Sequence, residues 1–320
     1  MISWNPALRG RHLRTMSDFS DEEMMELVDL ALALKARKDA GVRGDLLRRR
    51  NIALIFEKSS TRTRNSCVVA AQDEGGNAQY LGGHDTHFGH KESVKDSARV
   101  LGRLYDGILF RGYKQDTVEQ LARWSGVPVW NGLTDESHPT QILADLMTLR
   151  QAFGDIRGKK LVYMGDGRNN VANSLMMGCA KAGVNYVNCT PKELLPDPAL
   201  VAKAAAIAAR HGATVAVESD PAAAVRGANA LYTDVWVSMG EEAKTAERVK
   251  LLRPYQVNRA MMERTGKPGT IFLHCLPAVK GNEVTEEVFE SPASLVFDEA
   301  ENRMHTIKAV MVATLGEDDD

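Results

Sequence analysis

The chain has 320 residues, a length that predicts one to three domains, with two as the best match. Hydrophobic residues make up 44% of it and charged residues 26%, which is typical of a globular protein with a buried core. The formal net charge of −2 indicates no overall attraction to nucleic acid or to a membrane surface. We therefore expect neither as a partner.

The four cysteines, Cys67, Cys179, Cys189 and Cys275, show no CxxC spacing and no pairing pattern. Residues 1–14 contain no apolar targeting core, and no later stretch approaches 18 consecutive apolar residues. We expect a reduced, cytoplasmic protein without a disulfide framework.

The first clear element is the apolar run at 51–56, which predicts a buried strand. The segment Ser60-Thr61-Arg62-Thr63 follows it and opens a predicted helix over 62–74. A helix N-terminus attracts anions, hydroxyls donate to phosphate oxygens, and an arginine fork can bind two of them. The segment therefore predicts a phosphate site, and a capped helix with solvated basic residues is the alternative.

Short apolar runs continue to alternate with helical patterns. Further strands are predicted near 78–81, 107–110, 127–130, 160–164, 185–189, 213–217, 229–232 and 271–273. Helices are predicted over 92–104 and 115–125, from Pro139 to about 152, and from 299 to about 315. This alternation is typical of parallel sheets with helices on both faces. We predict an α/β fold with two doubly wound parallel-sheet domains, 1–150 and 151–299, joined by interdomain helices.

Two segments resemble ligand sites that we do not expect. His84, His87 and His90 stand three residues apart, but glycines flank them and no cysteine or carboxylate pair completes a metal site. The loop at 165–170 follows a predicted strand, but Asn170 replaces the third glycine of a dinucleotide-binding loop. We therefore expect no metal and no organic cofactor.

Other polar residues follow predicted strands, where open α/β sheets bind ligands. Arg111 follows an apolar run, and His138 and Gln141 stand three apart at a helix start, so they share one side of that helix. Asp234 follows the strand at 229–232 and can hold a substrate ammonium group. Each has a structural alternative: a surface arginine, a capping or core histidine, or a turn.

Two further candidates lie near the C-terminus. Cys275 follows the strand at 271–273, and its structural alternative is a small buried hydrophobic residue. Arg303 lies near the start of the C-terminal helix, where a surface salt bridge is the alternative.

Together these motifs resemble the ornithine branch of the aspartate/ornithine carbamoyltransferase family. The matching segments extend over almost the whole chain: 60–64, Arg111, 138–141, 234–240, 274–277 and 299–303. The Ser238-Met239-Gly240 loop and the His274-Cys275-Leu276-Pro277 segment resemble the ornithine branch in particular. The resemblance implies transfer of the carbamoyl group of carbamoyl phosphate to the δ-amine of L-ornithine. The products would be L-citrulline and phosphate, in arginine metabolism.

The resemblance also implies a role for each matching residue. Carbamoyl phosphate would be bound by Ser60, Thr61, Arg62, Thr63, His87, Arg111, His138, Pro139, Thr140, Gln141, Cys275, Leu276 and Arg303. Ornithine would be bound by Asn170, Asp234, Ser238 and Met239, and catalysis would involve Arg111, His138, Asp234 and Cys275. The Leu276–Pro277 bond would be cis, and the C-terminal helix, about 300–316, would return to the carbamoyl-phosphate domain.

His87 matches a family position that contacts the phosphate bound by a neighbouring subunit, which implies a homotrimer or an assembly of trimers.

Three alternative functions remain. A putrescine or aspartate carbamoyltransferase would share the phosphate half, but putrescine offers no carboxylate for the second half, and aspartate would require basic groups instead of Asp234. A non-catalytic binding regulator would be expected to lack Arg111, His138 or Cys275. A Rossmann dehydrogenase is disfavoured by Asn170.

Overall fold

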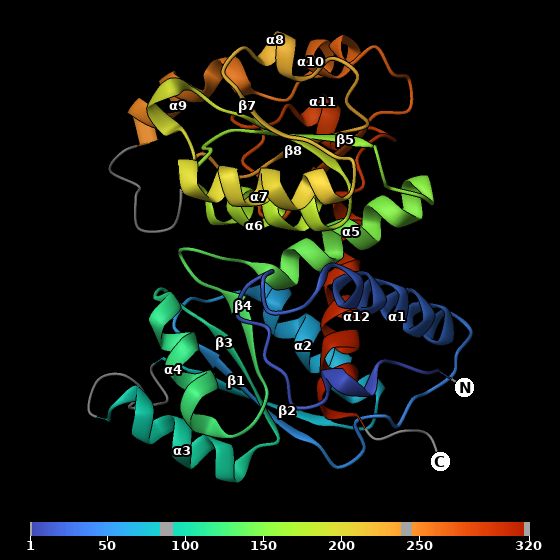
Figure 1. Cartoon of the computed structure of the whole chain (residues 1–320), viewed down its shortest axis with the longest axis vertical. Helices are drawn as coiled ribbons and strands as arrows, with labels where there is room; N and C mark the ends of the chain where they lie inside the picture. Colours follow the sequence, from blue (N-terminus) through green and yellow to red (C-terminus); the bar gives the residue numbers. More distant parts are fainter. Residues whose placement is uncertain (1, 84–91, 238–244, 317–320) are drawn as a thin grey trace. The chain divides into compact units, whose positions relative to one another are not determined.

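Two compact units make up the chain in the computed structural model, which describes residues 2–83, 92–237 and 245–316 (Figure 1). Unit 1 comprises Met1–Met147 and Glu301–Asp320, and unit 2 comprises Thr148–Ala300. Each unit has one all-parallel sheet with helices on both faces, so the predicted α/β fold is confirmed.

The sheet of unit 1 has the strand order β2-β1-β3-β4. Its strands are β1 (Asn51–Phe56), β2 (Asn77–Gly82), β3 (Gly107–Arg111) and β4 (Val129–Leu133). The fourth strand begins two residues later than predicted, because Pro128 has no N–H to donate to a sheet and offers only its carbonyl, which accepts from the Ile108 N–H. The order reverses between β1 and β3, and ligands bind at the carboxyl ends of strands beside such a reversal.

Successive side chains along each strand of unit 1 point to opposite faces of the sheet, and both faces are buried. Ala53 and Ile55 lie in one core cluster with residues of α3 (Val94–Leu104) and α4 (Gln115–Ser125). The third helix starts two residues later than predicted, because Ser93 caps it by accepting from the Asp96 N–H. The unit also contains η1 (Pro6–Leu8), α1 (Asp21–Asp39) and α2 (Thr61–Asp73).

The C-terminal helix α12 (Val296–Leu315) packs back on unit 1, as predicted. The Trp130 indole of β4 donates to Thr314 Oγ1 at 3.2 Å, and Lys308 Nζ lies 2.7 Å from Asp73 Oδ2 of α2. The helix starts three residues earlier than predicted. The chain passes between the units twice, within α12 and within α5 (Pro139–Phe153).

The sheet of unit 2 has the order β7-β6-β5-β8-β9 and reverses between β5 and β8. Its strands are β5 (Lys160–Met164), β6 (Asn185–Cys189), β7 (Val215–Glu218), β8 (Ala230–Thr233) and β9 (Ile271–His274). The seventh strand starts two residues later than predicted, since its pairing with β6 begins only at Val215, opposite Tyr186.

Helices cover both faces of the unit 2 sheet (Figure 1). One face carries α6 (Asn170–Lys181) and α7 (Pro198–Arg210). The other face buries Val162, Leu231 and Phe272 in a cluster with residues of the remaining helical segments. Those segments are η2 (Lys192–Leu194), α8 (Pro221–Ala224), α9 (Thr245–Leu252), η4 (Arg253–Tyr255), α10 (Arg259–Arg264) and α11 (Glu286–Phe289). Among the described residues, no helix combines the length and apolarity needed to span a bilayer.

Candidate functional site

The predicted phosphate segment lies in unit 1 at the carboxyl end of β1, beside the reversal in strand order. Ser60 caps α2, and its hydroxyl accepts from the Thr63 N–H at 3.1 Å. The first turn of α2 contains no acidic residue, so no carboxylate there offsets the positive end of the helix dipole. A helix N-terminus of this kind attracts anions, because its main-chain N–H groups and dipole present positive charge.

Two arginines from distant parts of the chain converge on Thr63. Arg303 Nη2 lies 2.9 Å from Thr63 Oγ1, and Arg111 Nη1 lies 3.4 Å from the same atom. The two arginines are 4% and 8% exposed. Two guanidiniums this close together direct several N–H donors toward one point, and such an arrangement suits the oxygens of a bound anion.

His138 and Gln141 extend this cluster from the start of α5. Arg303 Nη1 donates to Gln141 Oε1 at 2.6 Å, and Gln141 Nε2 donates to Asp145 Oδ1 at 2.8 Å. These two contacts fix which way round the Gln141 amide lies. Asp145 is completely buried and was not predicted as part of the site. Its spacing of four from Gln141 on one helix is the signal that could have identified it.

The pKa of His138 is lowered well below its usual value of 6.5. Burial is the largest cause, followed by the positive charges of Arg303, Arg111 and Arg62. The imidazole is therefore neutral at pH 7 and can donate a hydrogen bond without carrying a charge. Pro139 and Thr140 are also buried in the first turn of this helix.

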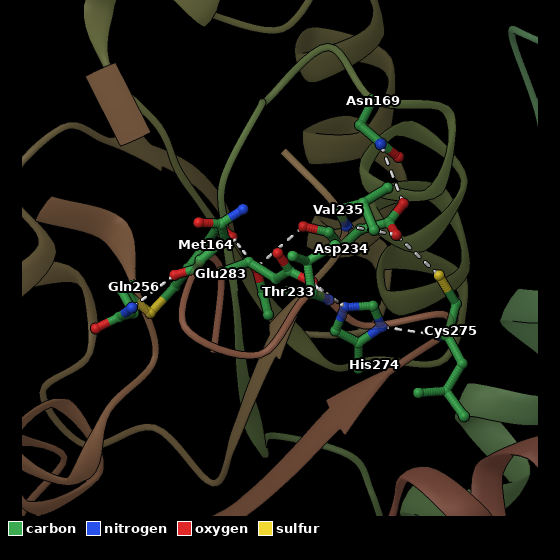
Figure 2. Close-up of polar contacts among 12 residues, drawn as sticks. Met164, Asn169, Thr233, Asp234, Val235, Gln256, His274, Cys275 and Glu283 are labelled. Carbon is green, nitrogen blue, oxygen red and sulfur yellow. Dashed lines mark hydrogen bonds and ion pairs between the residues drawn. The ribbon is translucent and has the colours of Figure 1, made fainter. Parts of the chain in front are cut away.

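A second cluster lies in unit 2, at the carboxyl ends of β8 and β9 (Figure 2). Its centre is Asp234, whose Oδ2 accepts from Asn169 Nδ2 at 3.1 Å. Asp234 Oδ1 accepts from Cys275 Sγ at 3.1 Å and from the Val235 N–H at 2.8 Å. Asn170 is the first residue of α6 and directly follows Asn169, which caps that helix. The structure thus brings Asp234 and Cys275 together and fixes the carboxylate in one orientation.

Cys275 differs from the other three cysteines, because it is partly exposed while they are buried. The Leu276–Pro277 bond is cis, as predicted. Leu276 itself has a φ of 59°, in the left-handed region that residues other than glycine rarely adopt.

Asp234, His274 and Cys275 place possible metal ligands within 4.8 Å of one another. Both ring nitrogens of His274 are already in hydrogen bonds, since Nδ1 accepts from the Leu276 N–H and Nε2 faces Glu283. The group therefore lacks a third available donor atom, and a zinc site with three protein ligands does not fit it.

Three predicted residues, His87, Ser238 and Met239, lie outside the described residues. Sequence reasoning missed Asn169, although an asparagine that caps a helix directly after a glycine-rich loop is a recognisable pattern. It also missed Glu283, for which no local pattern gives a signal.

Comparison with known proteins identifies the chain's relatives. Residues 11–151 match the family profile described as "Aspartate/ornithine carbamoyltransferase, carbamoyl-P binding domain", and residues 157–314 match the corresponding "Asp/Orn binding domain". The chain is 55% identical over 308 residues to an ornithine carbamoyltransferase of Caldanaerobacter subterraneus, covering 96% of this chain and 98% of the relative. It is 54% identical over 327 residues to a catabolic ornithine carbamoyltransferase of Bacillus licheniformis, covering 97% and 98%.

Solved structures agree with these matches. The ornithine carbamoyltransferase of Pyrococcus furiosus is 44% identical and superposes with a TM-score of 0.93 over 96% of this chain and 98% of that one. The enzyme of the same name from Giardia lamblia is 32% identical, with a TM-score of 0.85 over 95% and 97% of the two chains.

Proposed function

The chain belongs to the aspartate/ornithine carbamoyltransferase family, and we infer that it transfers the carbamoyl group of carbamoyl phosphate to the δ-amine of L-ornithine. The products are L-citrulline and phosphate, in arginine metabolism, which includes arginine biosynthesis. The observation that carries this function is the convergence of Arg111 and Arg303 on Thr63 beside the N-terminus of α2.

We assign the phosphate group of carbamoyl phosphate to the start of α2 and its neighbours. Ser60, Thr61, Arg62 and Thr63 offer main-chain N–H groups, hydroxyls and a guanidinium, and Arg303 supplies a second one. The carbamoyl group would be held by Arg111, His138, Pro139, Thr140, Gln141, Cys275 and Leu276. Its nitrogen would donate to Gln141 Oε1, whose amide orientation the contact with Arg303 fixes.

The reaction forms a bond between the δ-nitrogen of ornithine and the carbamoyl carbon, and breaks the bond from that carbon to the phosphate oxygen. A tetrahedral oxyanion develops in between. Arg111 and the neutral imidazole of His138 would donate to it, and Arg62 and the hydroxyls would stabilise the departing phosphate. Donors already held in place by burial and hydrogen bonds need little reorganisation during the reaction.

The attacking amine must be neutral. An alkylammonium with a pKa of about 10.4 requires roughly 4–5 kcal/mol for deprotonation at pH 7. Asp234 and Cys275 would hold the ornithine side chain while this proton passes to the departing phosphate. Asn170, Ser238 and Met239 would bind the rest of ornithine. A flat dependence of kcat on pH between 6 and 9 would contradict this role.

We also propose that the protein works in the cytoplasm as a homotrimer or an assembly of trimers. In that assembly His87 of one subunit would contact the phosphate bound by the next. The support for both proposals is the family resemblance, and sedimentation of the purified protein tests the assembly.

The function is tested by measuring citrulline formation from carbamoyl phosphate and L-ornithine, beside parallel reactions with putrescine and L-aspartate. We expect a kcat of at least about 10 s⁻¹ with ornithine alone. Product with putrescine or L-aspartate instead of ornithine would change the assigned acceptor substrate but leave the assigned phosphate site unchanged. No product with any of the three would favour the non-catalytic binding protein.

A further inference from the structure

His274 stands directly before Cys275 at the end of β9, and the mechanism above does not use its side chain. That side chain is completely buried. Its Nδ1 accepts from the Leu276 main-chain N–H at 2.8 Å, so Nδ1 carries no proton. The ring proton therefore lies on Nε2, an assignment that follows from the hydrogen bond.

Glu283 receives that proton's hydrogen bond. Its Oε1 lies 3.2 Å from His274 Nε2 (Figure 2). The same oxygen accepts from the Val279 N–H at 2.6 Å. Glu283 is itself completely buried. One carboxylate oxygen thus holds both the histidine ring and the main chain at Val279, four residues after Cys275.

The main chain of His274 is fixed as well. Its N–H donates to Glu299 Oε2 at 2.9 Å, and Glu299 Oε1 accepts from the hydroxyl of Tyr232 on β8 at 3.2 Å. His274 is consequently anchored to the neighbouring strand, and its ring is a rigid support for whatever it contacts.

What the ring supports is the segment Cys275-Leu276. Leu276 has a φ of 59°, and a leucine keeps such a conformation only where its surroundings impose it. The hydrogen bond from its N–H to His274 Nδ1 is one of the contacts that impose it. Cys275 lies between the two residues, and its Sγ reaches Asp234 Oδ1 at 3.1 Å.

We propose that His274 and Glu283 are positioning residues for the carbamoyl transfer. They hold the Cys275-Leu276 segment in the one conformation that presents the thiol and the main-chain carbonyls to the reactants. The proposal rests on the proposed function for its kinetic consequence, but the geometry of the segment can be measured without turnover.

Two substitutions of His274 separate the two hydrogen bonds. In His274→Asn the side-chain oxygen lies near the position of Nδ1 and can still accept from Leu276. His274→Gln can still reach Glu283 but leaves the Leu276 N–H without its acceptor. We expect kcat to fall 30- to 100-fold in His274→Gln and less than about 5-fold in His274→Asn. The KM for carbamoyl phosphate should change by less than 3-fold in both, because Arg303 and Thr63 are untouched.

Glu283 is tested in the same way. Glu283→Gln keeps an oxygen that accepts from His274 and Val279, so we expect kcat within about 5-fold of the native value. Glu283→Leu removes both contacts and should lower kcat as much as His274→Gln does. Equal losses of kcat in Glu283→Gln and Glu283→Leu would overturn the part assigned to Glu283.

The matched control is Thr270→Val, directly before the opposite end of β9, where the buried hydroxyl donates to the Ala228 carbonyl at 2.9 Å. It should lower the thermal midpoint and leave kcat unchanged. If His274→Gln does the same, its role is only structural and the proposal is overturned.

The measurement that needs no turnover is the rate at which iodoacetamide alkylates Cys275. Mass spectrometry distinguishes alkylation of Cys275 from alkylation of the three buried cysteines. We expect His274→Gln to raise this rate at least 3-fold, and His274→Asn and Thr270→Val to leave it unchanged. Unchanged alkylation in His274→Gln would overturn the proposal. A native protein that forms no citrulline would instead refute the proposed function, and the alkylation rates would still test the positioning.

Discussion

Arg303 on the C-terminal helix donates to Thr63 Oγ1 in the first turn of α2, although 240 positions separate the two residues. The return of α12 to unit 1 therefore adds a guanidinium to the polar cluster at the start of α2. The same guanidinium donates to Gln141, so one side chain joins three separate segments of the chain.

Replacing Arg303 by lysine keeps the charge but removes the planar fork that serves Thr63 and Gln141 together. Hydrogen bonds to charged groups contribute about 1.5–3 kcal/mol, so the KM for carbamoyl phosphate should rise roughly 10- to 150-fold. Initial rates at saturating ornithine measure this. The control is Arg11→Lys, a partly exposed partner of Glu23, which should leave the KM unchanged. An unchanged KM in Arg303→Lys would remove Arg303 from the phosphate site.

The capping hydroxyl of Ser60 should have two separable effects. Ser60→Ala removes the acceptor of the Thr63 N–H and should cost about 1 kcal/mol of stability, as N-cap losses do. It should also raise the KM for carbamoyl phosphate. Ser20→Ala removes the corresponding cap of α1 and should cost a similar amount with no change in KM. Denaturant unfolding and initial-rate kinetics on both variants measure these effects. If the KM for carbamoyl phosphate in Ser60→Ala equals that in Ser20→Ala, Ser60 acts only as a cap.

The carboxylate of Asp234 should matter more for turnover than for carbamoyl phosphate. Asp234→Asn retains the shape that Cys275 and Val235 contact but removes the charge that would hold the ornithine amine. We expect kcat to fall at least about 100-fold, equivalent to roughly 2.7 kcal/mol, with the KM for carbamoyl phosphate within 3-fold. Asp220→Asn, at the cap of α8, is the control and should leave both constants unchanged. A kcat within 5-fold of native in Asp234→Asn would exclude the proposed role.

The sequence predicted the parts of the site that depend on order along the chain. Polar residues directly after apolar runs lie at the carboxyl ends of strands, and this placed Arg111 at the end of β3 and Asp234 just after β8 correctly. Periodicity also predicted both sheets, because parallel strands buried on both faces are continuously apolar.

Contacts set by tertiary packing could not be predicted in the same way. Glu283 pairs with His274 because the loop between them folds back, and nothing in the spacing of nine residues requires that. Asp145 and Asn169 carry only weak signals, a spacing of four from Gln141 and a helix cap, because each contacts another side chain of its cluster. The strand starts at Val129 and Val215 depend on which neighbouring main-chain groups pair, which propensity does not determine.

The lowered pKa of His138 predicts how stability changes with acidity. The histidine of the unfolded chain has a pKa of about 6.5, whereas the folded value lies well below it. Between these two values the unfolded chain binds more protons than the folded protein, so the free energy of unfolding falls as pH falls. The contribution of His138 is fully present above about pH 6.5 and is lost below it, with a slope of up to about 1.4 kcal/mol per pH unit.

His138→Gln keeps a buried polar side chain that cannot titrate. We expect the free energy of unfolding of this variant to fall less steeply than that of the native protein between pH 6.5 and 5, while the two slopes agree between pH 7 and 8. Denaturant unfolding at half-unit steps of pH measures both slopes. His12 and His305 also have lowered pKa values, caused mainly by burial, so part of the native slope should remain in the variant. Identical slopes below pH 6.5 would mean that the pKa of His138 is the same in the folded and the unfolded chain, which would contradict the lowered pKa.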